Sequence, residues 1–142
     1  MVPVSSAPQD AAGLAVSAGL YADAIVVRAS GALEMSTAPI LRAPLERIWD
    51  LPDVAVVIID VAELVFCDSA GLGELVRAGR RSRDKGARLI LAGVDGQLAR
   101  RLELTGLRRS FEVHADLAAA LRAVRSAGRW ARPDDDRFSP AP

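Results

Sequence analysis

Asp68 and Ser69 stand side by side in the stretch FCDSAGLG, which follows an apolar run and opens a helical pattern. A hydroxyl beside a carboxylate at such a place has three possible uses. Ser69 could be a nucleophile, a helix cap, or an acceptor for a group that another protein transfers. The side chains available elsewhere in the chain discriminate among these uses.

Capping is the simplest use of the Asp68–Ser69 pair. The first backbone N–H groups of a helix lack partners and carry a partial positive charge, so either side chain could supply the oxygen they need. Gly71 and Gly73 indicate more than a cap, because each glycine costs a helix about 1 kcal/mol relative to alanine and capping does not require them. We expect these glycines to leave a bare surface over which a partner, or a nucleotide phosphate held by a partner, reaches Ser69. Their spacing matches neither of the two common phosphate-binding loops, G-x-x-x-x-G-K-[ST] and G-x-G-x-x-G.

Catalysis by Ser69 lacks a base. The flanking residues do not form G-x-S-x-G, and the only histidine, His114, is expected at the end of an edge strand beside a helix start. The only cysteine, Cys67, is expected to be a small buried hydrophobe, since Asp68 disfavours a thiolate. No cluster of ligands has a metal-site spacing. We therefore expect no catalytic residue, no metal and no cofactor.

The elements that position Ser69 follow from apolar periodicity. Strands are expected at LAVSA and AIVVRASGAL, separated by a turn near residues 19–23, and then at DVAVVIID, ARLILAGV and FEVH. Helices are expected between the later strands and after the last one. The order ββαβαβαβα predicts an α/β fold: one small domain with a mixed, mostly parallel sheet of about five strands and four helices. Ser69 then lies beyond the carboxyl end of the central strand, where functional residues of such sheets gather.

Two helices carry details that bear on the site. The first is expected to be capped by Ser36 or Thr37 and to kink at Pro44 or to begin later than the pattern suggests. The second opens in FCDSAGLG and ends at Gly86. Its apolar face holds Leu72, Leu75 and Val76, and its opposite face holds Glu74, Arg77 and Arg81.

Composition excludes several function classes. Eighteen basic and eighteen acidic residues balance, so no overall field favours nucleic acid or an anionic membrane. A lone cysteine, no signal-like N-terminus and no long apolar stretch are typical of a soluble cytoplasmic protein. We expect flexible tails at residues 1–13 and 128–142 around a domain at 14–127.

The motifs FCDSAGLG, GALEMSTAPILRAPLERI and RRLELTGLRRSFEVHADLAAAL resemble the STAS domain of bacterial anti-sigma factor antagonists, over roughly Leu14 to Val124. The resemblance implies that Ser69 is phosphorylated by an anti-sigma factor acting as a serine kinase. It implies that the unphosphorylated protein binds this kinase, that phosphorylation releases it, and that a serine phosphatase resets the switch. Added negative charge beside Asp68 in a desolvated interface is repulsive, which is consistent with such a switch.

The resemblance also implies the contact positions. Asp68 precedes the phosphorylated serine and is expected to orient its hydroxyl. Gly71, Leu72 and Leu75 follow on the same helix, and Glu34 lies in a loop near the serine. Asp60 matches an acid that ends the central strand, and VAEL after it replaces a turn that often carries a second hydroxyl. The alternative is a constitutive STAS subunit of a larger assembly, such as a lipid-transport ATPase or a stress-signalling complex, without serine turnover.

Overall fold

The computed structural model describes residues 2–3, 9–11 and 13–128. Its central sheet has the strand order β3 (Leu14–Tyr21), β4 (Ala24–Leu33), β5 (Val56–Cys67), β6 (Arg88–Ala92) and β7 (Glu112–His114). β3 is antiparallel to β4, and the later neighbours are all parallel. The predicted α/β class with a mostly parallel five-stranded sheet is therefore confirmed.

Two short strands extend this sheet beyond β3. β1 (Val2–Pro3) and β2 (Gln9–Ala11) both pair antiparallel with β3. They fall in the segment expected as an N-terminal tail, and most of the segment expected as a C-terminal tail lies outside the described residues.

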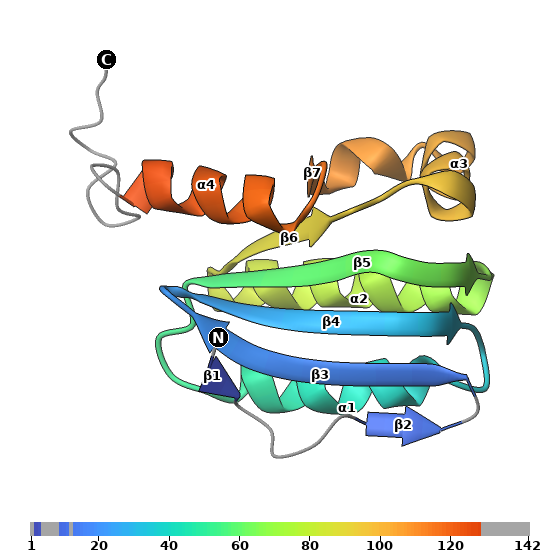
Figure 1. Cartoon of the computed structure of the whole chain (residues 1–142), viewed down its shortest axis with the longest axis horizontal. Helices are drawn as coiled ribbons and strands as arrows, with labels where there is room; N and C mark the ends of the chain where they lie inside the picture. Colours follow the sequence, from blue (N-terminus) through green and yellow to red (C-terminus); the bar gives the residue numbers. More distant parts are fainter. Residues whose placement is uncertain (1, 4–8, 12, 129–142) are drawn as a thin grey trace.

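The described residues also form four helices and one 3₁₀ turn. They are α1 (Ala38–Trp49), α2 (Ser69–Lys85), α3 (Gly96–Thr105), η1 (Leu107–Ser110) and α4 (Leu117–Gly128). Figure 1 shows α1 and α2 behind β3, β4 and β5. α4 packs on the opposite face from α1 and α2, against a small cluster that includes Val26, Ile58 and Ile90.

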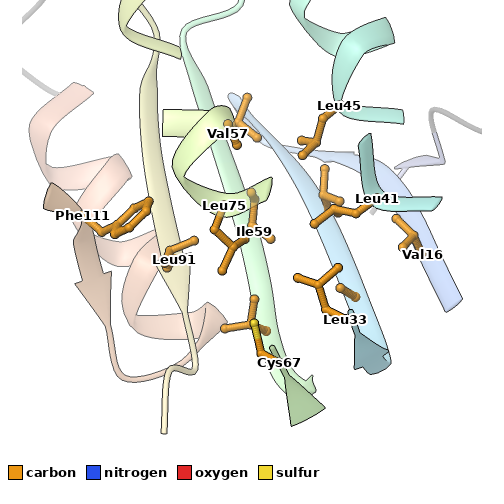
Figure 2. Close-up of a cluster of buried hydrophobic side chains, with 14 of the residues drawn as sticks. Val16, Leu33, Leu41, Leu45, Val57, Ile59, Cys67, Leu75, Leu91 and Phe111 are labelled. Carbon is orange, nitrogen blue, oxygen red and sulfur yellow. The ribbon is translucent and has the colours of Figure 1, made fainter. Parts of the chain in front are cut away.

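The larger core lies between the sheet and α1 and α2. Alternate residues of β4 and β5 point into it, among them Val27, Leu33 and Ile59, and Leu41 and Leu75 meet them from the two helices. Figure 2 shows these side chains converging, with Cys67 at one end of the cluster. This packing fixes α2 on the sheet and so fixes where Ser69 lies.

The first hairpin is tighter than the sequence predicts. β3 continues to Tyr21, which pairs with Ala24, so that only Ala22 and Asp23 form the turn and Ala22 has φ 54°. The small residues near position 19 predicted that the first strand ends and the turn begins there, before Tyr21. The ladder persists because Gly19 and Leu20 still pair with β4.

The first helix does not begin late, which was one of the two possibilities predicted from Pro44. α1 starts at Ala38, before Pro44, with Pro39 in its first turn, where proline is well tolerated. Thr37 occupies the N-cap position but makes no side-chain cap bond. Its hydroxyl donates to the Ala32 carbonyl at 2.7 Å and accepts from the Glu34 N–H at 2.9 Å, so it orders the preceding loop instead.

The central strand is longer than predicted. The apolar pattern predicts that it ends at Asp60 and that VAEL forms a turn, whereas β5 runs on to Cys67. The extension stays paired with β4 through two shifts of register, between Arg28 and Ser30 and between Gly31 and Ala32. These irregularities hide the alternation expected of a strand, which is why the pattern read as a turn.

The face of α2 assigned to solvent is partly buried. Glu74 is only 6% exposed because α1 covers that side of the helix. Both Nε and a terminal nitrogen of Arg42 on α1 donate to the Glu74 carboxylate. Placing Glu74 with exposed Arg77 was therefore wrong, since α2 packs on the sheet and on α1 at once.

Candidate functional site

Ser69 is the first residue of α2 and lies directly after β5 at the carboxyl edge of the sheet. Its side chain is exposed. The residue that caps the helix is Asp68, whose Oδ1 accepts from the Gly71 N–H at 2.8 Å. Among the described residues, no hydrogen-bond partner is found for the Ser69 hydroxyl. Capping therefore leaves this hydroxyl available.

Asp68 also holds the loop that follows β4. Its Oδ2 accepts from the Met35 N–H at 3.2 Å, and its own N–H donates to the Leu33 carbonyl at 3.2 Å. The structure thus brings the Glu34 loop to the start of α2, over a sequence separation of more than thirty residues. The expectation that Asp68 orients the Ser69 hydroxyl finds no matching hydrogen bond in the described part of the chain, because both carboxylate oxygens bind backbone N–H groups.

The two glycines after Ser69 have different environments. A Cβ on Gly71 would lie 2.4 Å from the Leu33 carbonyl oxygen, so Gly71 faces inward and permits a close approach within the protein. A Cβ on Gly73 would meet nothing within 4 Å, and Gly73 is exposed. The bare surface expected from both glycines is therefore supplied by Gly73 alone.

Two other predicted contact residues lie in the core. Leu75 is fully buried and Leu72 is 6% exposed. Leu75 points into the cluster that includes Ile59 and Leu91 (Figure 2). Their side chains therefore anchor α2 on the sheet. Glu34 is half-buried, and its carbonyl accepts from the Thr37 and Ala38 N–H groups, so its backbone shapes the loop.

Apolar residues that the sequence pattern does not predict are exposed at this edge. Met35 is 75% exposed, and Val65 and Phe66, just before the Asp68 cap, are 79% and 38% exposed. A signal for Met35 was present in the sequence, because a methionine in the polar stretch EMST belongs to no helical or strand period. Val65 was hidden by the irregular end of β5.

Cys67 is buried as predicted. Burial raises the pKa of its thiol to about 11, with a further contribution from the neighbouring Asp68 carboxylate, which opposes a second negative charge. Its backbone N–H donates to the Gln97 side chain of α3 at 3.1 Å. The thiol is therefore protonated at neutral pH and packs as part of the core.

His114 is engaged on β7. Its Nε2 lies 2.9 Å from a Glu112 carboxylate oxygen, and Arg88 donates to both oxygens of the same carboxylate. Within the described ranges no hydrogen bond joins His114 to Ser69. Nor do those ranges contain three or more His, Cys, Asp or Glu side chains grouped to hold a metal ion. Among the same residues, no helix is both long and apolar enough to cross a membrane.

A second feature lies on the face of β3, β4 and β5 opposite α1 and α2. It is a shallow groove of about 430 Å³, lined among others by Ser17, Arg28, Ser30, Asp60 and Glu63. Asp60 lies inside β5, not at its end as the resemblance implied. Its Oδ2 is 3.5 Å from Arg28 Nε, and its Oδ1 accepts from the Ala62 N–H. This groove shares no lining residue with the surface around Ser69.

Comparison with known proteins agrees with this architecture. A family model described as the STAS domain matches residues 16–120. The anti-sigma-B factor antagonist of Listeria monocytogenes is 33% identical over 91 residues, which cover 64% of this chain and 79% of the Listeria protein.

Solved structures agree as well. An anti-sigma factor antagonist from Mycobacterium paratuberculosis is 28% identical, with a TM-score of 0.67 over 85% of this chain and 99% of that one. The Bacillus protein SpoIIAA in its phosphorylated form shares the fold at 21% identity, with a TM-score of 0.63 over 78% of this chain and 99% of that one. The chain belongs to the STAS domain family.

Proposed function

We propose that this protein is an anti-sigma factor antagonist whose binding is switched by phosphorylation of Ser69. The single observation that carries the proposal is the exposed Ser69 hydroxyl at the start of α2, left free because Asp68 caps the helix. The relatives named anti-sigma factor antagonists supply the class of partner.

The switch follows from the difference between a hydroxyl and a phosphate. A partner can bury the Ser69 hydroxyl at little cost if one hydrogen bond is made. A phosphoserine carries a charge of about −1.5 to −2, and the Asp68 carboxylate lies on the adjacent residue. Burying both anions in one interface is unfavourable, whereas in the free protein water and the start of α2 stabilise the phosphate. Phosphorylation therefore favours the unbound protein.

The proposal assigns the chemistry to other proteins. An anti-sigma factor with serine kinase activity transfers the phosphate, and a serine phosphatase removes it. This chain contributes the acceptor and the surface around it, and it acts as a non-enzymatic regulator in the cytoplasm.

The test uses the full chain, ATP and each candidate serine-kinase anti-sigma factor of the source genome. We expect one phosphate on Ser69 by mass spectrometry, and none on the Ser69→Ala variant. Ser36→Ala is the matched control, because Ser36 is an exposed serine in the neighbouring loop. Label on Ser36, or on no residue, would reject the switch.

Binding tests the second half of the proposal. Ser69→Ala should bind the kinase persistently, while Ser69→Glu should bind at least about tenfold more weakly. Equal affinities of the two variants, together with a stable co-purifying assembly, would instead favour the constitutive subunit.

A further inference from the structure

We infer that Met35 is an apolar anchor of the partner-docking surface and that Asp68 is the positioning residue that holds it there. The inference rests on the proposed function, since the partner is the anti-sigma factor that reads Ser69. Met35 would then be a recognition element in the loop after β4, whereas the phosphorylated residue, Ser69, lies at the start of α2.

The loop that carries Met35 is ordered on both sides. Before it, the Thr37 hydroxyl bridges the Glu34 N–H and the Ala32 carbonyl at 2.9 and 2.7 Å. After it, the Ala38 N–H donates to the Glu34 carbonyl at 2.7 Å. Asp68 Oδ2 then fixes the Met35 N–H itself from the start of α2. The backbone at Met35 therefore has a defined position relative to Ser69.

The side chain of Met35 has no comparable burial, since it is 75% exposed. An apolar side chain on an ordered backbone is favourable for binding, because little loop entropy remains to be lost when it is covered. Methionine is flexible and polarizable, and it adapts to an apolar pocket of a partner. We conclude that the anti-sigma factor presents an apolar pocket to Met35.

The same surroundings explain why recognition and switching are linked. The Asp68 carboxylate, on the residue next to Ser69, already accepts two backbone N–H bonds. A docking surface of this kind buries apolar and hydroxyl groups readily but disfavours a phosphate. Met35 supplies affinity, and the Ser69 hydroxyl makes that affinity conditional.

Leu104 on α3 provides a matched control. It is 79% exposed, about as much as Met35, but it belongs to a helix that begins after β6 and not to the Asp68 tether. Both Met35→Ala and Leu104→Ala remove an exposed apolar side chain, so both variants should unfold at nearly the same urea concentration as the wild type.

The tether is tested without a partner, by amide hydrogen exchange of the whole chain. We expect Asp68→Ala to speed exchange at the Met35 N–H at least about tenfold. Asp68→Asn keeps only one acceptor oxygen, so it can bind the Gly71 N–H or the Met35 N–H but not both, and we expect it to retain protection at no more than one of these two groups. Unchanged Met35 exchange in Asp68→Ala would overturn the positioning role.

The anchor is tested by titrating the unphosphorylated chain with the anti-sigma factor. We expect Met35→Ala to weaken binding at least about tenfold, Met35→Leu to restore it, and Leu104→Ala to change it less than about twofold. If the wild type binds and Met35→Ala binds equally well, the anchor is rejected while the proposed function stands. If the wild type binds no anti-sigma factor, both are rejected.

Discussion

At the start of α2, Asp68 and Ser69 have separate roles, although the sequence allowed either of them to cap the helix. Asp68 caps the helix and holds the Met35 loop, while the Ser69 hydroxyl has no hydrogen-bond partner among the described residues. The two glycines divide their roles likewise, since Gly71 faces Leu33 and Gly73 faces solvent. Substitutions at these positions should therefore have opposite effects.

Alanine at the two glycines tests this difference. Gly71→Ala places a Cβ 2.4 Å from the Leu33 carbonyl oxygen, which is backbone and cannot easily move, so we expect a loss of about 1–3 kcal/mol in the free energy of unfolding. Gly73→Ala meets no atom within 4 Å and should stabilise α2 by up to about 1 kcal/mol. Urea unfolding of both variants measures the two values. Equal losses would show that the close approach at Leu33 is not what requires Gly71.

Cys67 should be unreactive in the folded protein. Its thiol pKa is raised from 9.0 to about 11, so its thiolate fraction at pH 8 is about a hundredfold below that of an ordinary thiol. Its labelling rate with iodoacetamide should keep rising with pH toward 11 and should become fast in denaturant. A Cys67→Ala/Leu104→Cys variant, with an exposed thiol, is the control that should react readily in the native state. Rapid native labelling of Cys67 would contradict this burial.

At the scale of elements, α1 and α2 are joined by ion pairs of unequal burial. Glu74 is buried beneath Arg42, whereas Glu46 pairs with Arg77 and Arg81 near the surface. Hydrogen bonding to Arg81 lowers the pKa of the Glu46 carboxyl. The depth of each pair decides what its loss costs, because a buried carboxylate cannot regain water easily.

Arginine truncation compares the two pairs. Arg42→Ala leaves the Glu74 carboxylate buried without its guanidinium and should lower the free energy of unfolding by about 1–3 kcal/mol. Arg77→Ala breaks an exposed pair and should cost less than about 1 kcal/mol. Urea unfolding at low and high salt distinguishes them, since only the exposed pair is strongly screened. Equal costs would mean that Glu74 regains water when Arg42 is removed.

The edge of the sheet at β6 and β7 has a pH-dependent contact. Hydrogen bonds from Arg88, and then from His114, lower the pKa of the Glu112 carboxyl below its ordinary value of 4.5. A carboxyl with a lowered folded-state pKa stabilises the fold above its unfolded value, and this contribution is lost as the pH falls through the folded value. Stability should therefore decline below pH 4.5 as Glu112 is protonated.

Glu112→Gln tests that contact. The variant should be less stable than the wild type at pH 7, and the difference should shrink as the pH falls below 4.5. Thermal unfolding from pH 7 to 3 gives the comparison. Glu103→Gln, at an exposed position of α3, is the control and should not change this dependence. A difference that stays constant with pH would exclude Glu112 as its source.

At the scale of the whole molecule, charge on Ser69 should act on docking and not on folding. Ser69 is exposed, and the start of α2 favours a negative group, so Ser69→Glu should leave the free energy of unfolding within about 0.5 kcal/mol of the wild type. Circular dichroism and thermal unfolding of Ser69→Glu and of the phosphorylated chain provide the check. A phosphorylated chain that loses its fold would replace the docking explanation with an unfolding one.

Much of the fold was accessible from the sequence because long apolar runs have few alternatives. The all-apolar run before Asp60 is the buried central strand, and Gly86 and Gly106 end α2 and α3 in the left-handed conformation. The errors fall where tertiary contacts override local pattern. The end of β5 stays paired with β4 through register shifts, and α1 buries Glu74 on what looked like a solvent face.

The sequence by itself determined the order of the strands and helices from Leu14 onward, the family resemblance, and Ser69 as the residue of interest, because each depends on local periodicity or on adjacent residues. Only the tertiary structure decided that Asp68 joins two distant segments, that Gly71 serves internal packing, and that Met35 stands exposed beside the helix start. These depend on which carbonyl or N–H group the fold brings within 3 to 4 Å, and no local pattern of residues records that distance.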